Sequence, residues 1–145
     1  MNKIRRTADY NETEKNMLET GIKGREELTV TEDKTAKNVG SGELEVFATP
    51  AMAALMEKTA YKSVADKLGE GEGTVGISLD LKHIAPTPMG MKVVCESELV
   101  EVDGRKLTFD IKVSDEKEKV GTAKHCRFII NNAKFSAKAA GKAEK

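Results

Sequence analysis

A chain of 145 residues is long enough for one domain with a hydrophobic core and short for two. Its 24 basic residues balance its 24 acidic residues, so no net charge attracts nucleic acid or an anionic membrane. Only four Phe, two Tyr and no Trp are available to stack on bases, and no run of about 18 apolar residues could cross a bilayer. We therefore expect a globular protein whose partners include neither nucleic acid nor a membrane.

The first 20 residues are polar and have no hydrophobic period, so we expect a flexible leader before a single domain over residues 21–138. No apolar segment follows the basic start, which argues against a secretory signal. Cys95 and Cys126 both fall in strand-like runs and not in a metal-binding spacing. This pattern predicts reduced thiols in the core of a cytoplasmic protein, and no metal site.

Alternating apolar and polar residues predict a first strand at residues 26–31. After a glycine-containing loop, a long helix is predicted from Thr49 to about Lys67, with Thr49 as its N-cap and Pro50 in its first turn. The glycine-rich segment 69–73 should end this helix.

One residue of the predicted helix does not suit a packing role. Four residues share one of its sides: Ala53, Glu57, Ala60 and Val64. A carboxylate among apolar neighbours is costly to bury unless it is paired. We therefore expect Glu57 to be buried in a functional site between the helix and the sheet.

Four long antiparallel strands are predicted after the helix, at residues 74–85, 91–102, 105–114 and 120–131. Asp103 and Gly104 form the turn between the second and the third. His83 lies near the end of the first, on the side that carries Val75, Ile77, Leu79 and Leu81. A second titratable group on an apolar face supports the same site between helix and sheet.

In the last predicted strand, the residues expected to face the core are Val120, Cys126, Phe128 and Ile130. The Ala- and Lys-rich tail from Phe135 to Lys145 should be helical or frayed, and we assign its last part, residues 139–145, as frayed. A helix of about 18 residues spans roughly 27 Å, close to the width of five strands at about 4.8 Å each. We therefore predict an α+β hotdog fold, a curved antiparallel β-sheet wrapped around one long helix.

Seven short motifs occur in order: VFATP at 46–50, LME at 55–57, GEGTVG at 71–76, HIAPTPMG at 83–90, VDGRKL at 102–107, GTAKHCR at 121–127 and KFSAK at 134–138. Each is weak alone, but their order and spacing resemble the fluoroacetyl-CoA thioesterase family of hotdog proteins over roughly residues 26–138. The resemblance implies an acyl-CoA thioesterase, a hydrolase that works as a homodimer. It also implies no cofactor, because CoA is part of the substrate.

The resemblance places a catalytic group at Thr49, Glu57 and His83, and substrate-binding positions at Gly76 and Arg127. Glu57 would attack the thioester or activate water, and His83 would exchange protons near neutral pH. The family carries an aromatic lid before the helix, whereas this chain has no aromatic residue in that segment. The acyl group is therefore left open, as small or medium.

Each of these residues also has a structural interpretation. Thr49 suits an N-cap, and Gly76 suits a β-bulge. Glu57 suits an ion pair with a lysine, and His83 a hydrogen-bonded place in the core. Arg127 is expected on the outward face of its strand, in solvent or at a dimer interface. A non-catalytic acyl-CoA binder or sensor is the alternative function, whereas a hydratase would need an Asp/His pair that the sequence lacks.

Overall fold

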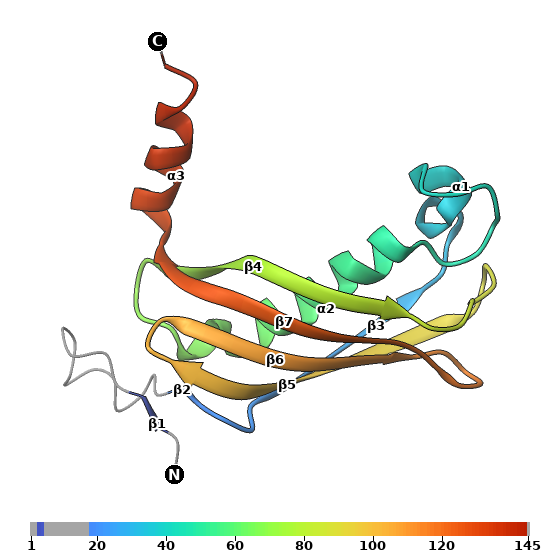
Figure 1. Cartoon of the computed structure of the whole chain (residues 1–145), viewed down its shortest axis with the longest axis horizontal. Coiled ribbons are helices and arrows are strands. Elements are labelled where there is room, and N and C mark those ends of the chain that lie inside the picture. Colours follow the sequence, from blue (N-terminus) through green and yellow to red (C-terminus); the bar gives the residue numbers. More distant parts are fainter. Residues whose placement is uncertain (1–2, 5–17, 145) are drawn as a thin grey trace.

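A curved antiparallel sheet packs against one long helix (Figure 1). The computed structural model describes residues 3–4 and 18–144, so most of the predicted leader lies outside the described residues. The elements in chain order are β1 (Lys3–Ile4), β2 (Leu18–Glu19), β3 (Lys23–Thr29), α1 (Ala36–Val39), α2 (Thr49–Val64), β4 (Glu72–His83), β5 (Lys92–Asp103), β6 (Lys106–Ser114), β7 (Lys119–Asn131) and α3 (Asn132–Gly141). Single 3₁₀ turns at Glu32–Lys34 and Ala65–Lys67 precede α1 and follow α2.

Among the described residues, the main sheet has five strands in the order β3-β5-β6-β7-β4, and every neighbouring pair is antiparallel. The strands that flank α2 in the sequence, β3 and β4, form the two edges. Helix α2 contacts all five strands, and the sheet curves around it. This is the predicted α+β arrangement of one helix inside a wrapped sheet.

The core lies between α2 and the inner face of the sheet. The buried residues of the helix are Met52, Leu55, Met56, Thr59, Ala60 and Val64. On β6, four residues face them, as the alternation of apolar and polar residues along that strand predicts: Leu107, Phe109, Ile111 and Val113. Full burial of a Leu or Phe side chain contributes about 1.5–3 kcal/mol, so this layer is the main source of stability. Glu57, by contrast, is exposed in the single chain, and its predicted burial there is wrong.

The start of α2 differs from the prediction. Ala48 is the N-cap, and no side chain caps the helix there. Thr49 is the first helical residue, and its hydroxyl is hydrogen-bonded to His83 instead of capping the helix. The predicted end is confirmed, since the 3₁₀ turn after Val64 closes at Lys67.

A bulge interrupts β4 where it pairs with β7. The register shifts between Gly76 and Ser78, which leaves Ile77 as the extra residue. The predicted inward positions of Val75 and Ile77 are therefore wrong: Val75 pairs with a residue of the outer face, and Ile77 is 53% exposed. After the bulge the alternation follows the prediction as far as His83.

Strand β7 turns its polar residues inward. The inward residues are His125, Arg127 and Ile129, which are 0%, 7% and 1% exposed. The prediction that Cys126, Phe128 and Ile130 face the core is therefore wrong, and so is the outward placement of Arg127. The polar pair can be buried because hydrogen bonds satisfy it. Cys95 is in the core as predicted, whereas Cys126 is only partly buried.

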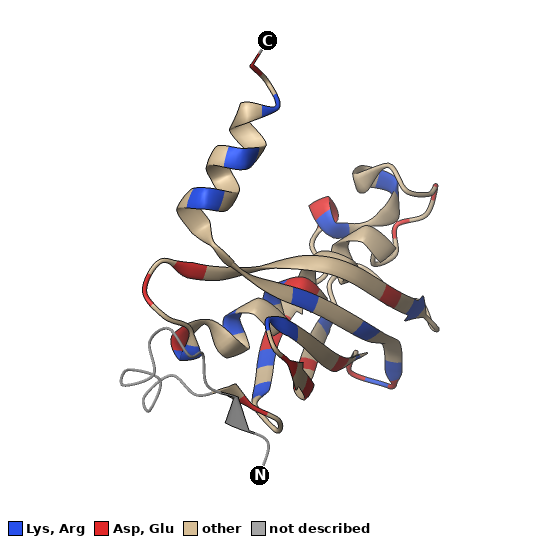
Figure 2. Cartoon of the chain, turned by 60° about the vertical axis from the view of Figure 1, so that its left-hand side comes forward, with Lys and Arg blue, Asp and Glu red and all other residues tan. Residues whose placement is uncertain are grey.

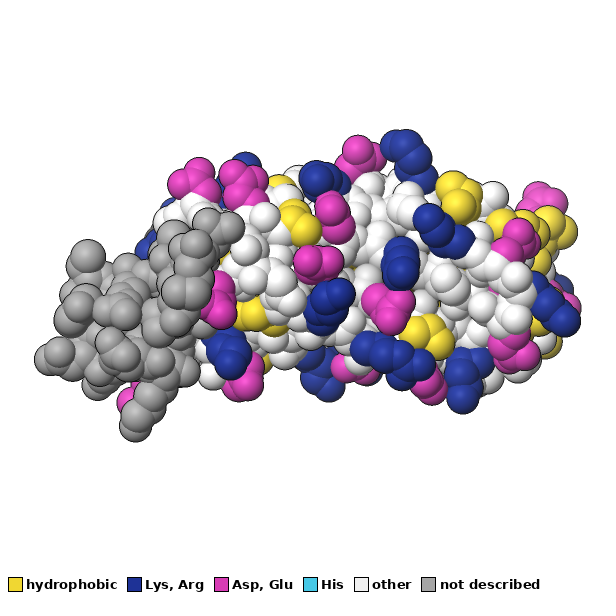
Figure 3. All heavy atoms as spheres, turned by 90° about the horizontal axis from the view of Figure 1, so that it is seen from below, with side chains coloured by type: hydrophobic (Ala, Val, Ile, Leu, Met, Phe, Trp, Pro, Cys, Tyr) yellow, Lys and Arg dark blue, Asp and Glu magenta, His cyan; other side chains and the backbone are white. Residues whose placement is uncertain are grey.

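The outer surface of the sheet carries charges of both signs (Figures 2 and 3). Several form exposed ion pairs, such as Lys124 with Asp110 at 3.0 Å and Lys82 with Asp80 at 3.5 Å. Exposed pairs of this kind contribute little to stability, about 0–1 kcal/mol each. Within the described part of the chain, no helix is both long and apolar enough to cross a membrane.

Candidate active site

Thr49 and His83 join the start of α2 to the end of β4. The Thr49 hydroxyl lies 2.7 Å from His83 Nδ1, and the Phe47 ring and the imidazole form a T-shaped contact with 6.2 Å between centroids. Burial lowers the pKa of His83, and a weak contact with the backbone of Ala85 offsets part of this effect. His83 Nε2 is buried and has no well-formed hydrogen bond to any described residue. The imidazole is thus held in place through Nδ1, while Nε2 is available for another group.

A cavity of about 350 Å³ opens beside this pair. It is lined by Ala36, Ser41, Val46, Phe47, Thr49, His83, Ala85 and Pro86. Most of these side chains are small or apolar, so the cavity suits a short apolar group next to the imidazole.

A second polar group forms where the middle of α2 faces β4 and β7. Arg127 donates from Nε to Thr74 Oγ1 at 2.7 Å and from Nη2 to the Thr74 carbonyl at 3.0 Å. Its Nη1 lies 3.1 Å from His125 Nε2, and His125 Nδ1 lies 2.8 Å from the Ser78 carbonyl. A nearly buried guanidinium is therefore held by neutral partners on two strands.

Glu57 and Gly76 complete this second group. A Cβ atom on Gly76 would lie 3.3 Å from Arg127 Nη1, 3.3 Å from His125 Cε1 and 3.9 Å from the Glu57 carboxyl carbon. A side chain at residue 76 would therefore crowd Arg127 and His125, and Gly76 also borders the β-bulge that was its structural alternative. Burial lowers the pKa of Arg127, and the charge of Glu57 partly offsets this. Tyr61, one turn after Glu57, presents its ring 5.8 Å from the guanidinium carbon.

The structure brings the predicted site residues together as two groups and not as one. Thr49 lies with His83, whereas Glu57 lies with Gly76 and Arg127. Glu57 follows Thr49 by eight positions along the helix, a distance of about 12 Å. Within a single chain, Glu57 and the Thr49–His83 pair are therefore at different points along α2.

Sequence reasoning missed His125 and Tyr61. His125 is two residues before Arg127, so both belong to one face of β7, and a correct assignment of that face would have found it. Tyr61 follows Glu57 by four residues and so lies on the same side of α2.

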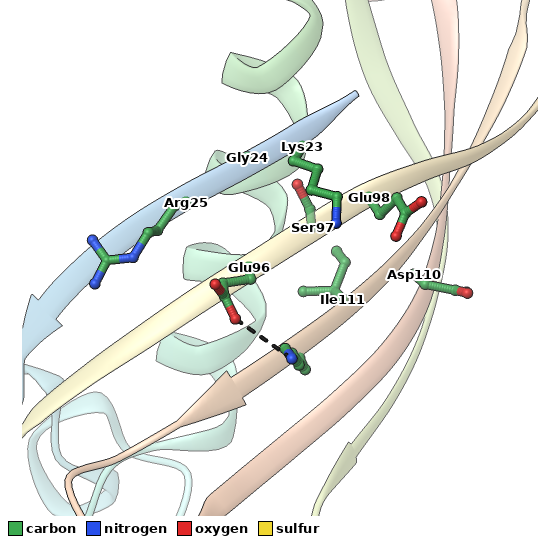
Figure 4. A pocket seen from close by; sticks show the side chains of 9 residues that line it. Lys23, Gly24, Arg25, Glu96, Ser97, Glu98, Asp110 and Ile111 are labelled. Carbon is green, nitrogen blue, oxygen red and sulfur yellow. Dashed lines mark ion pairs between the residues drawn. The ribbon is translucent and has the colours of Figure 1, made fainter. Parts of the chain in front are cut away.

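A larger hollow, of about 500 Å³, lies on the outer face of β3, β5 and β6, away from both groups (Figure 4). Its charged side chains are Lys23, Arg25, Glu96, Glu98, Asp110 and Lys112. Glu96 pairs with Lys112 at 3.6 Å, and basic and acidic residues are equal in number. Exposed and mutually neutralised charges do not provide a reactive group, so this hollow is not the candidate active site. Among the described residues no cluster of His, Cys, Asp and Glu could hold a metal ion.

Comparison with known proteins agrees with the fold of one long helix inside a curved antiparallel sheet. The model of the fluoroacetyl-CoA-specific thioesterase family matches residues 30–133. The fluoroacetyl-CoA thioesterase of Streptantibioticus cattleyicolor is 38% identical over 94 residues, which are 65% of this chain and 68% of that protein. A solved structure of a fluoroacetyl-CoA thioesterase has a TM-score of 0.82 at 32% identity, and the match covers 87% of this chain and 98% of that one. A hot-dog-like protein from Thermanaerovibrio acidaminovorans shares the fold, with a TM-score of 0.81 at 22% identity over 94% of this chain and 98% of its own.

Fold and comparisons together define a hotdog protein of the thioester hydrolase class, and the predicted fold is confirmed. The chain belongs to the fluoroacetyl-CoA-specific thioesterase family. It is therefore an acyl-CoA thioesterase, as the sequence motifs predict.

Proposed function

We propose that the chain hydrolyses a small or medium acyl-CoA to the free acid and CoA, with Thr49, Glu57 and His83 as its catalytic group. The observation that carries this proposal is the geometry of His83. Its Nδ1 is held by Thr49, its buried Nε2 has no well-formed hydrogen bond to a described residue, and the residue lines a cavity. A neutral imidazole placed in this way is suited to move one proton near neutral pH.

The three residues have complementary roles in this proposal. The carboxylate of Glu57 attacks the thioester carbonyl or removes a proton from the water that attacks it. The carbon–sulfur bond then breaks, and His83 relays to the CoA thiolate the proton that Glu57 has taken from water. On the direct-attack route, water then hydrolyses the mixed anhydride between the acyl group and Glu57, which releases the acid and returns the proton that His83 has given to the thiolate. Thr49 holds the imidazole in orientation, and the first turn of α2 places N–H groups and a positive dipole end near the developing oxyanion. CoA enters and leaves as part of the substrate, and no cofactor takes part.

The working form in this proposal is a homodimer that pairs through the free edge of β4. Seven residues in the middle of that strand, 73–79, carry no charge, whereas charged side chains make up most of β3 at the other edge. Charges protect an edge strand from pairing, so β4 is the edge suited to self-association. Two antiparallel β4 strands bring the Gly76 end of one towards the His83 end of the other. Glu57 of one subunit would then approach the Thr49–His83 pair of its partner.

The acyl group is proposed from the cavity beside His83. Relatives are named for fluoroacetyl-CoA, and one related structure contains acetyl-CoA. In this chain the segment before α2 contributes Ala36 and Ser41 to the lining, and both are small. An acyl chain longer than two carbons therefore has room to enter, and a short or medium chain is the expected substrate.

The test is thiol release from a panel of acyl-CoAs, from acetyl to octanoyl, followed with a thiol reagent. We expect turnover with at least one member and a loss of roughly 100-fold or more in Glu57→Ala and in His83→Ala, since each removes a reacting group. Circular dichroism and thermal unfolding control for folding, and Leu44→Ala, a change at an exposed residue outside the cavity lining, is the matched control. Binding of acyl-CoA without thiol release would favour the non-catalytic binder or sensor instead.

A further inference from the structure

Arg127 carries a positive charge at a place that solvent hardly reaches. The residue is 7% exposed, and the hydrogen bonds that hold it go to neutral atoms of Thr74 and His125. A guanidinium has five N–H donors, and three are used here, which leaves two. Because Gly76 has no side chain, Nη1 is open towards Glu57. The direction of the guanidinium therefore decides what these remaining donors can reach.

The hydrogen bonds of His125 define its protonation. The Ser78 carbonyl can only accept, so Nδ1 at 2.8 Å must carry the proton. In the neutral ring Nε2 is then an acceptor, and it faces Arg127 Nη1 at 3.1 Å. Burial lowers the pKa of His125, and the charge of Arg127 lowers it further. Ser78 directly follows the bulge in β4, which directs its carbonyl towards the imidazole.

We propose that His125 is a positioning residue, which holds the guanidinium of Arg127 over Gly76 so that its two remaining donors point to the acyl-thioester group of the substrate. This inference rests on the proposed thioesterase function and assigns a role in it to a residue outside the catalytic group. His125 acts only through Arg127. The acceptor at Nε2 is the essential feature, and the bond from Nδ1 to Ser78 fixes the tautomer in which Nε2 is an acceptor.

Two amide substitutions separate these two bonds. In His125→Gln the amide oxygen takes the place of Nε2, so it still accepts from Arg127 while the bond to Ser78 is lost. In His125→Asn the amide nitrogen takes the place of Nδ1, so it still donates to Ser78 while Arg127 loses its acceptor. Both variants remove the same ring from the same buried place. A purely structural role would affect the two alike.

The experiment compares kcat/KM and the thermal unfolding midpoint of the wild type, both amide variants and Cys126→Ser, a control on the opposite face of β7. We expect His125→Asn to lose roughly 10- to 100-fold in kcat/KM, the effect of one hydrogen bond to a charged group. His125→Gln should stay within about threefold of the wild type, although both variants lower the unfolding midpoint to a similar degree. Equal kcat/KM in the two amide variants, or activity that simply follows the unfolding midpoint, would overturn the inference.

The outcome also separates this inference from the proposed function. If the wild type releases thiol and the amide variants are equal, the function stands and the positioning role fails. If the wild type releases no thiol, the proposed function fails, and the same comparison is made by calorimetric binding of a thioether analogue of acetyl-CoA. The affinity for this analogue then tests the position of the guanidinium. Weaker binding by His125→Asn than by His125→Gln supports the positioning role, and equal affinities reject it.

Discussion

Two imidazoles, that of the half-buried His83 and that of the buried His125, make the free energy of unfolding depend on pH in mildly acidic solution. Burial lowers the pKa of both His83 and His125 in the folded state. The unfolded chain has histidine pKa values of about 6.5, so it binds more protons than the folded chain as the pH falls below that value. Above about pH 6.5 these two groups therefore leave the free energy of unfolding unchanged. Below that pH they lower it, progressively as the pH falls towards the pKa values of the folded state.

We expect the thermal unfolding midpoint to fall between about pH 7.5 and about pH 5.5, and to fall less in His83→Gln and in His125→Gln. The carboxyl groups of Glu27, Asp33 and Asp115 have lowered pKa values, so these three do not account for a fall in this range. Glu27, for example, has its pKa lowered from 4.5 by a hydrogen bond from Arg25, so it titrates below the window. Unfolding curves over a pH series check the prediction. The same pH slope in the wild type and in both variants would contradict it.

At the scale of elements, α2 lies so close to β3 that only a glycine fits between them. A Cβ atom on Gly24 would lie 2.7 Å from Ser97 Oγ, 2.8 Å from Ser63 Cβ and 2.8 Å from the Thr59 carbonyl. Two of these neighbours belong to the helix, and one is backbone that cannot rotate away. The spacing of α2 from the edge of the sheet therefore depends on the absence of a side chain at residue 24.

Gly24→Ala should lower the free energy of unfolding by roughly 1–3 kcal/mol, the usual effect of inserting a methyl group into a packed contact. Gly141→Ala is the matched control, because a Cβ atom there meets nothing within 4 Å. Urea denaturation measures both. If Gly24→Ala were as stable as the control, α2 would have to be free to move away from β3.

The sequence predicted the elements well and the faces of two strands poorly. The helix, its glycine-rich end and the inward face of β6 follow from clear periodicity and are confirmed. β7 has apolar residues on both faces, so alternation could not show that the side with His125 and Arg127 is buried. The bulge at Ile77 then reverses the face of β4, and no local pattern reveals it because the pairing strand determines it.

At the scale of the whole molecule, one chain does not place the proposed catalytic group in contact. Glu57 is exposed beside Arg127, and about 12 Å of helix separates it from the Thr49–His83 pair. A carboxylate that must lose water to react needs a cover. In the dimer proposed through β4, the partner subunit supplies both this cover and the missing histidine. The two active sites would then each take Glu57 from one subunit and His83 from the other.

Mixing two inactive variants tests this arrangement. In a mixed dimer of Glu57→Ala with His83→Ala, one shared site has both defects and the other has an intact Glu57 and an intact His83. Random exchange of subunits makes half of the dimers mixed, so about a quarter of the wild-type turnover should return. Exchange is achieved by mild urea treatment and dilution, with each variant treated alone as the control. If both residues acted within one chain, every site in the mixed dimer would carry one defect, and no activity would return.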